Sequence, residues 1–273
     1  MTLPLAAAFA LAGCAIAQPP VAPPAGAPRV LLLGEVHDNP DGHARRYEML
    51  KARVDEGFRP AIAMEQFDRE RQADLDRAMA ECADAACVVR RAEPESQRWE
   101  WPHYAPVIDL ALAHKLPVIA ANLSRTDASR IVRGGVRPVL DDATLAAFGL
   151  NRPLPRDLAE GQRREIDEGH CNRLPASIAD GMVRAQVARD VWMAKIVADA
   201  AARGRDVVLL AGNGHVRRDL GVPRWLGGTA AAGARSVGFV EEPDRGEFDE
   251  RVAIVPHERE DPCAAIPVRP PQQ

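Results

Sequence analysis

Residues 30–37 read VLLLGEVH, an apolar run that ends at a glycine and is followed at once by an acid and a histidine. A run without polar alternation is typical of a strand that is covered on both faces of a sheet. In open parallel sheets, ligands bind beyond the carboxyl ends of the strands, and glycine there adopts backbone angles that other residues avoid. The stretch therefore predicts a buried strand that opens onto a site containing Glu35 and His37.

A second stretch far along the chain has the same construction. Residues 207–215 read VVLLAGNGH, which is again an apolar run, a glycine and a polar group that ends in His215. Two such strand ends in one parallel sheet meet at the same edge. We therefore expect the histidines of both motifs to lie near one another.

Apolar runs alternate with helical patterns along the rest of the chain. The predicted strands are 30–33, 61–64, 116–121, 207–211, 236–240 and 251–255, and the predicted helices are 40–57, 68–82, 102–114, 124–133 and 178–203. Asn39 and Pro40 are typical of a helix start, and Gly204 is typical of a helix end. This alternation predicts an α/β fold, with a largely parallel central sheet flanked by helices.

The domain organisation follows from the segments that break this pattern. Residues 134–174 are interrupted by prolines and predict a helical insertion, of the kind that often forms a lid or an interface. We expect a single α/β domain over residues 29–257, followed by an irregular, proline-rich tail at 258–273.

The N-terminal segment has the features of an export signal. Residues 3–12 are small and apolar, too few to span a membrane, and residues 11–14 read LAGC, which resembles a bacterial lipobox. On this interpretation residues 1–13 are a signal peptide, Cys14 is lipidated, and 14–28 form a Pro/Ala-rich tether. The expected location is the bacterial cell envelope, anchored by lipid to the outer membrane and facing the periplasm. No Lys or Arg precedes the apolar stretch, so an upstream start or an ordinary cleaved signal remains an alternative.

The other cysteines and the overall charge indicate which cross-links and which partners to expect. Export favours disulfides between the four remaining cysteines, with Cys82 to Cys87 and Cys171 to Cys263 as the preferred pairing of three; free thiols are the alternative. The net charge is −4 and no long basic run occurs, so we expect no nucleic-acid partner. The apolar share of 47% is enough for a sizeable core.

Polar groups at several strand ends predict a shared site. Glu35 and His37 follow the first strand, Glu65 the second and His215 the fourth. Two carboxylates and two imidazoles are suited to holding a metal ion, activating water or binding a ligand. The alternative is that individual members, Glu65 above all, only form ion pairs within the fold.

The helices beside these strand ends add further groups. His43, Tyr47, Leu50 and Val54 share one helical face, with His43 in the first turn. Asp190 shares a face of the long helix with Gln186 and Met193, a face that we expect to pack against the site or the core.

Four motifs in this order resemble the ChaN family of haem-binding lipoproteins. They are residues 33–43, 64–67, 186–194 and 212–217, the last followed by the Gly-Val-Pro at 221–223. The resemblance covers about residues 29–255, nearly all of the exported part. It implies an α/β fold in a superfamily that also contains Tiki-type metalloproteases and erythromycin esterases.

The resemblance also implies a ligand and partners. It implies haem binding in iron uptake, with haem held between two chains, and hence a homodimer on haem binding and a haem-uptake receptor as partners. A tyrosine phenolate ligates the iron in that family and a histidine contacts a propionate. The chain has only two tyrosines, Tyr47 and Tyr104, so one of them is the candidate iron ligand, with His43, His37 and His215 as further candidate haem contacts.

An enzyme remains the alternative to a non-catalytic haem carrier. In a hydrolase, Glu35 or His37 would activate water and His215 would assist; in a metal-dependent form, Glu35, His37, Glu65 and His215 would hold a divalent ion. Neither a His-Glu-x-x-His motif nor a Gly-x-Ser-x-Gly motif occurs in the sequence.

Overall fold

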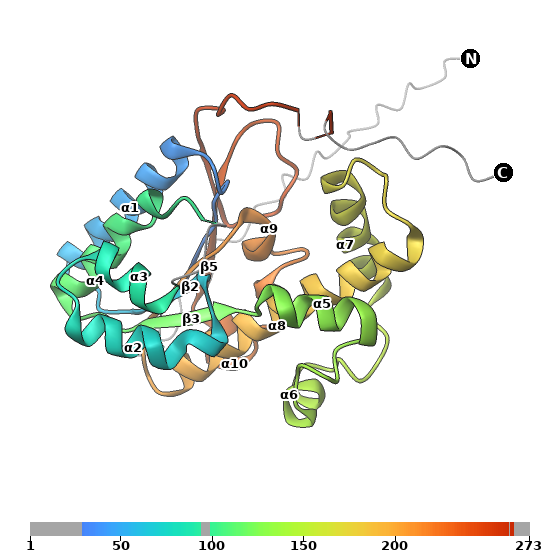
Figure 1. Ribbon diagram of the computed structural model, residues 1–273, viewed down its shortest axis with the longest axis horizontal. Helices are drawn as coiled ribbons and strands as arrows, with labels where there is room; N and C mark the ends of the chain where they lie inside the picture. Colours follow the sequence, from blue (N-terminus) through green and yellow to red (C-terminus); the bar gives the residue numbers. More distant parts are fainter. Residues whose placement is uncertain (1–28, 94–98, 262, 265–273) are drawn as a thin grey trace, which may run out of the picture.

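A single parallel sheet forms the centre of the molecule. The computed structural model describes residues 29–93, 99–261, 263 and 264, and in it six strands lie in the order β3-β2-β4-β1-β5-β6, all parallel (Figure 1). The strands are β1 Val30–Leu33, β2 Ala61–Asp68, β3 Val118–Asn122, β4 Val207–Leu210, β5 Ala234–Val240 and β6 Glu250–Ala253. The predicted α/β fold with a largely parallel sheet is therefore confirmed, and the first strand begins and ends at the predicted residues.

Helices cover both faces of the sheet. The helices are α1 Pro40–Asp55, α2 Gln72–Glu81, α3 Ala85–Ala92, α4 Ala105–His114, α5 Arg125–Gly134, α6 Asp142–Ala147, α7 Arg156–Gly169, α8 Ala176–Ala202, α9 Asn213–Val216 and α10 Gly228–Ala232. Short 3-10 turns lie at Arg69–Arg71, Trp101–His103 and Val222–Trp225. Helices α1 to α4 pack on one face and α8 and α10 on the other, as Figure 1 shows. Because both faces are buried, the central strands carry apolar residues throughout.

The first helix begins as the sequence predicts. The Asn39 side chain accepts a hydrogen bond of 2.8 Å from the backbone N–H of Gly42, and Pro40 occupies the first turn. This cap satisfies a backbone donor that would otherwise lack a partner at the start of the helix. The cap fixes the start of α1 at the end of the loop that carries Glu35 and His37.

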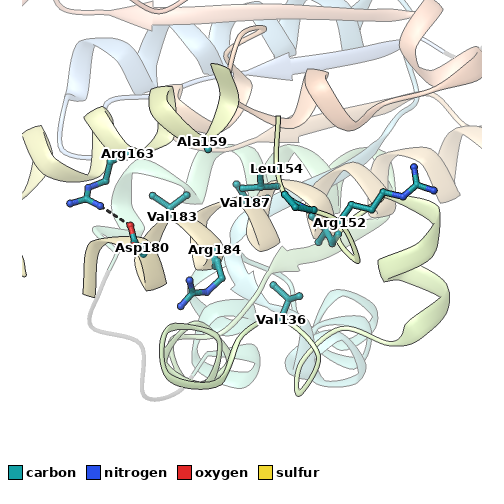
Figure 2. Close-up of a pocket in the computed structure, with 11 residues that line it drawn as sticks. Val136, Arg152, Leu154, Ala159, Arg163, Asp180, Val183, Arg184 and Val187 are labelled. Carbon is teal, nitrogen blue, oxygen red and sulfur yellow. Dashed lines mark hydrogen bonds and ion pairs between the residues drawn. The ribbon is translucent and has the colours of Figure 1, made fainter. Parts of the chain in front are cut away.

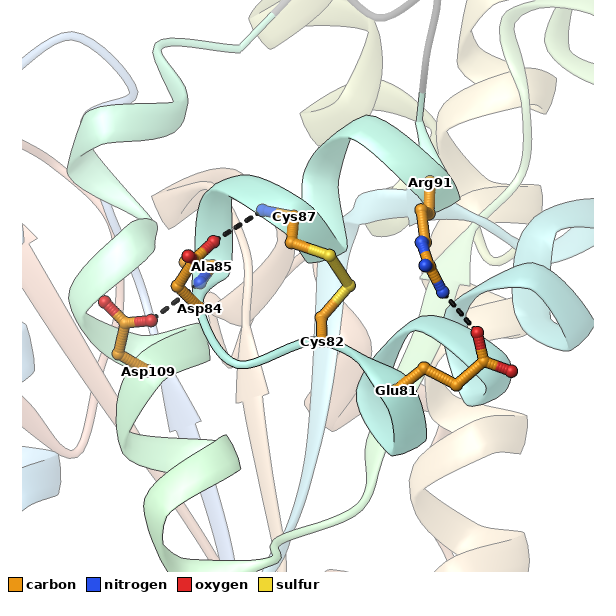
Figure 3. Close-up of a disulfide and its surroundings, with 7 residues drawn as sticks. All are labelled: Glu81, Cys82, Asp84, Ala85, Cys87, Arg91 and Asp109. Carbon is orange, nitrogen blue, oxygen red and sulfur yellow. Dashed lines mark hydrogen bonds and ion pairs between the residues drawn. A yellow bond between two sulfur atoms is a disulfide. The ribbon is translucent and has the colours of Figure 1, made fainter.

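The region after β2 differs from the prediction of one helix over 68–82. Asp68 ends β2, a 3-10 turn follows, and α2 begins only at Gln72. Helix α3 was not predicted. Asp84 caps its start, where the Asp84 side chain accepts a hydrogen bond of 2.7 Å from the N–H of Cys87. A disulfide joins Cys82 to Cys87 across the turn between α2 and α3 (Figure 3). The cap and the disulfide lie at the break between α2 and α3, which the period of the apolar residues does not indicate.

The predicted insertion at 134–174 contains two helices, α6 and α7. Together with α5 they pack against α8 at one end of the molecule, around a third apolar cluster (Figure 1). The second predicted disulfide, Cys171 to Cys263, joins the end of this region to the tail. The tail has no helix or strand over 258–261. Cys14, the signal peptide and the tether lie outside the described residues, among which no helix is long and apolar enough to cross a membrane.

Candidate functional site

The strand order brings the predicted site residues together. Strand β4 lies between β2 and β1, so the loop after β4 passes between Glu65 on β2 and Glu35 after β1. The backbone N–H of Gly212 donates to the Glu65 carboxylate at 2.8 Å, and the N–H of Asn213 donates to the carbonyl of Glu35 at 2.9 Å. Both motifs that opened the sequence analysis therefore contribute to one edge of the sheet.

Two glycines make this close approach possible. A Cβ atom on Gly212 would lie 2.9 Å from Cε1 of His37, and a Cβ atom on Gly34 would lie 2.1 Å from the amide oxygen of Asn213. Neither distance is compatible with a side chain. The glycines in the two motifs thus allow the histidine of the first strand end to pack on the backbone of the second.

Glu35 is the centre of a buried hydrogen-bond network. Its side chain is fully buried and accepts from the guanidinium of Arg46, which is 1% exposed. Tyr104 donates its hydroxyl proton to Glu35 at 2.7 Å, Nδ1 of His37 lies 2.7 Å away, and the Gln66 amide nitrogen lies 3.3 Å away. A carboxylate that is buried this deeply is stable only with a charged partner and with its lone pairs satisfied. Arg46 and the surrounding donors meet both conditions.

His43 is held in a single neutral form by its neighbours. Nη2 of Arg46 lies 3.0 Å from Nδ1 of His43, and because arginine only donates, Nδ1 is the acceptor. Nε2 therefore carries the proton and donates to the carbonyl of His37 at 2.9 Å. Burial lowers the pKa of His43 to about 4. His43 therefore supports the loop that carries His37, and its role as a haem contact stays a prediction.

His37 is the accessible group of this network. Its side chain is 50% exposed, while Nδ1 faces the buried carboxylate of Glu35. The ring of Trp99 meets the His37 ring edge-on, with 5.0 Å between centroids. A carboxylate that accepts from Nδ1–H leaves a lone pair available on Nε2. His37 is thus suited to accept a proton, to ligate a metal or to donate to an anion once it is protonated.

A second network lies beside the first. Nδ1 of His215 lies 2.6 Å from Asp190 and Nε2 lies 3.4 Å from Glu65, and all three side chains are buried. Burial disfavours the charged imidazolium, but the two carboxylates outweigh it and raise the pKa of His215 to about 10. The pKa of Glu65 lies below its usual range because the charge of His215 overcomes the effect of burial. Burial in turn raises the pKa of Asp190 to about 6, against the attraction of His215.

The insertion supports this second network. Gln162 on α7 donates to Asp190 at 3.2 Å and to the carbonyl of Leu220 at 3.1 Å, and Gln186 on α8 lies 3.3 Å from Nε2 of His215. His215 is therefore held below the surface between two carboxylates, whereas His37 is the histidine that reaches solvent. The distinction comes from burial and could not be read from two similar motifs.

The two tyrosines occupy different environments. Tyr104 is fully buried, donates to Glu35, and has a pKa that burial raises above its usual range, so it is poorly suited to act as a phenolate. Tyr47 is only partly buried, at the margin of the apolar core. Of the predicted helical face, α1 buries His43, Leu50 and Val54 and partly buries Tyr47, and it buries Arg46 as well. The tyrosine with the more open surroundings is therefore Tyr47.

The metal interpretation of these residues is not supported. Within residues 29–93, 99–261, 263 and 264, no group of three or more His, Cys, Asp or Glu side chains is arranged to hold a metal ion. The reason lies in the partners of the two carboxylates: Glu35 is bound by Arg46 and Tyr104, and Glu65 by Gly212 and His215. Side chains that are already engaged in this way do not converge on a common point.

Three members of the site were not predicted from the sequence: Arg46, Gln66 and Gln162. Arg46 follows His43 by three positions and so shares its helical face, which is a signal that the sequence contained. Gln66 directly follows Glu65 on β2. Because successive side chains of a strand point to opposite faces, the pattern did not indicate that both residues belong to one site. No local pattern indicates Gln162, since its contact with Asp190 depends on how the insertion folds back.

Comparisons with known proteins place the chain in a family. A model of the family described as "Haem-binding uptake, Tiki superfamily, ChaN" matches residues 23–226. A solved structure titled "Cofacial heme binding to ChaN of Campylobacter jejuni" is 20% identical, with a TM-score of 0.60, over 81% of this chain and 85% of that one. A mutant erythromycin esterase EreC in its open conformation is 15% identical, with a TM-score of 0.46, over 79% of this chain and 70% of that one. No curated protein matches the chain.

Proposed function

The chain belongs to the haem-binding uptake family of the Tiki superfamily that includes ChaN, and from this membership we propose that it binds haem and serves in haem uptake. The observation that carries the proposal is the half-exposed His37, held by the buried Glu35 at the edge of the sheet. Its outward nitrogen is suited either to a haem propionate or to the iron itself.

The surroundings of His37 fit a flat, partly apolar ligand. Trp99 stands edge-on to the His37 ring, and His103 stacks on His43 with 4.6 Å between centroids. Both Trp99 and His103 are partly exposed. Aromatic rings at the surface bind flat macrocycles through their faces and edges. Because His37 is half exposed, bound haem would keep part of its surface outside this chain, which favours a second chain as cover and hence the homodimer.

We assign the phenolate role to Tyr47. A phenolate is a hard anionic ligand that is suited to ferric haem, and Tyr47 is the less buried of the two tyrosines. Tyr104 instead has a structural part, since its hydroxyl helps to hold Glu35 in place. On this assignment Tyr47 and His37 are the residues of α1 and the β1 loop that hold haem.

The cellular role rests on the N-terminal sequence. The lipobox-like segment that ends at Cys14, followed by a Pro/Ala-rich tether, supports a lipid-anchored protein of the bacterial envelope. We place it at the outer membrane, facing the periplasm. There it would receive haem from an uptake receptor or pass it to another carrier.

Titration with ferric haem tests the binding proposal. Purified protein should take up haem stoichiometrically with a tyrosinate-type absorption spectrum, which Tyr47→Phe should abolish and Tyr104→Phe should leave in place. His37→Ala should weaken haem uptake, whereas His257→Ala, which removes an exposed histidine, should not. Absence of stoichiometric uptake by the unaltered protein would refute the proposal.

One observation favours a hydrolase as the second candidate. Glu35 orients His37 through Nδ1, which is how a carboxylate prepares a histidine to act as a general base. This candidate predicts turnover of an activated ester that is lost in His37→Ala and in Glu35→Gln. An activity that both variants retain, or no activity in the unaltered protein, would eliminate it.

A further inference from the structure

A hollow in the helical insertion lies apart from the site described so far. It has a volume of about 430 Å³ and is formed by the segment before α6, the segment before α7, and the facing sides of α7 and α8 (Figure 2). Small-molecule sites commonly have volumes of about 300–1,000 Å³. The hollow is therefore large enough for a ligand, and none of the residues assigned to haem lines it.

The inner surface of the hollow is apolar. Val183 and Val187 on α8 are buried, and Val136, Leu150 and Leu154 pack beside them against the core of the insertion. This surface is suited to a hydrocarbon body, because such a ligand removes apolar area from water on both sides.

The rim of the hollow carries an excess of positive charge. Arg152, Arg163 and Arg184 line it with a single carboxylate, Asp180 (Figure 2). Asp180 and Asp167 each lie 2.7 Å from the Arg163 guanidinium. Arg152 and Arg184 form no ion pair with any of the described residues. The two side chains extend in different directions from the hollow (Figure 2), so each offers charge-assisted donors to a carboxylate on its own side of the rim.

We propose that this hollow binds an amphipathic carboxylate of the fatty-acid class, with its chain on Val183 and Val187 and its carboxylate at one of the two rim arginines, Arg152 or Arg184. Charge and lining together point to this class of ligand. A neutral lipid would leave the arginines without a role, and a simple anion would leave the apolar surface exposed. The site lies beyond the proposed haem function and does not depend on it.

The lining also argues against haem as the occupant. Among the residues that line the hollow there is no histidine, tyrosine, cysteine or methionine, which are the side chains that ligate haem iron. An apolar carboxylate needs no such ligand. The haem proposal and this one therefore concern different surfaces of the molecule and are tested by different variants.

Calorimetric titration with sodium dodecanoate, below its micelle concentration, tests the proposal. The purified chain should bind one dodecanoate saturably, and it should not bind dodecyltrimethylammonium, which has the same chain length and the opposite charge. The double variant Arg152→Ala/Arg184→Ala should weaken binding by at least about tenfold, the effect of losing one charge-assisted hydrogen bond. Arg164→Ala, which removes an exposed arginine of α7 that does not line the hollow, should leave binding unchanged.

A second variant tests the position of the ligand rather than its charge. Ala159→Phe places a ring in the hollow from α7 and should abolish dodecanoate binding while the far-ultraviolet circular dichroism stays unchanged. If that variant does not fold, the arginine pair, which lies at the surface, still decides the question. Absence of binding, equal binding of both surfactants, or unchanged affinity in the arginine variant would overturn the proposal. Each outcome is separate from the haem titration, which these variants should not affect.

Discussion

Replacing Arg46 with methionine tests whether the buried Glu35 network holds the site together. The substitution keeps most of the side-chain volume but removes the charge that faces Glu35 and the donor to Nδ1 of His43. Both members of the ion pair are almost fully buried. Removing one partner of such a pair typically costs about 3–5 kcal/mol, because the remaining charge is left without compensation.

A proton limits the size of this loss. Glu35 in the variant can remove its unpaired charge by taking up a proton. At pH 7, protonating a carboxyl whose pKa is near 4.3 costs about 1.4 kcal/mol for each pH unit above that pKa, which is about 4 kcal/mol in total. We therefore expect the free energy of unfolding to fall by about 3–4 kcal/mol at pH 7. At pH 5 the same protonation costs only about 1 kcal/mol. The loss of unfolding free energy in the variant should therefore shrink as the pH falls, because Glu35 binds more protons in the folded variant than in the unfolded variant.

Urea unfolding at pH 7 and pH 5 measures this difference directly. The double variant Glu35→Gln/Arg46→Met should recover much of the stability at pH 7, because it leaves no unpaired charge. Arg45→Met removes a neighbouring, exposed arginine that pairs with Asp41, and it should cost less than about 1 kcal/mol. A loss in Arg46→Met that is as small as in this control, or one that does not change with pH, would refute the reasoning.

Three further predictions concern pH and the disulfides. Because the pKa of folded His43 is lowered from 6.5 to about 4, stability should fall as the pH drops through this range, and urea unfolding of His43→Gln should show a weaker acid dependence. The raised pKa of His215, about 10, predicts stability that is complete below pH 6.5 and is lost as the pH rises towards 10; unfolding of His215→Gln should be less sensitive to alkali, and an equal slope would contradict this. Replacing Cys171 and Cys263 with alanine should cost about 4–5 kcal/mol because the bond spans 92 residues, more than the roughly 2 kcal/mol expected for the Cys82–Cys87 bond, and thermal unfolding of the two variants should rank them in that order.

Most of the fold could be predicted from the sequence because its signals are local. Apolar runs such as VLLL at 30–33 indicate buried strands directly, and the Asn39–Pro40 start of α1 is determined by neighbouring residues. The break between α2 and α3 was missed because it depends on the Asp84 cap and on a disulfide rather than on periodicity. Local chemistry can end a helix where the apolar pattern continues.

The sequence predicted that four of the site residues meet at one edge of the sheet, but it did not predict their electrostatics or three of their partners. The order β2-β4-β1 brought Glu35, His37, Glu65 and His215 to one edge, as expected from parallel strands. The sequence did not indicate that Arg46 neutralises one carboxylate, or that His215 lies between two. Those facts depend on how deeply each group is buried and on which distant segment covers it. For this reason two similar histidine motifs have given one exposed imidazole and one buried cation.

Haem uptake by the purified chain tests the central claim most directly. Ferric haem is added in steps, the absorption spectrum is followed to saturation, and the same titration is repeated with Tyr47→Phe. The account predicts a saturating, stoichiometric change with a tyrosinate spectrum in the unaltered protein, and a different spectrum in the variant. A spectrum that stays that of free haem throughout the titration would contradict it.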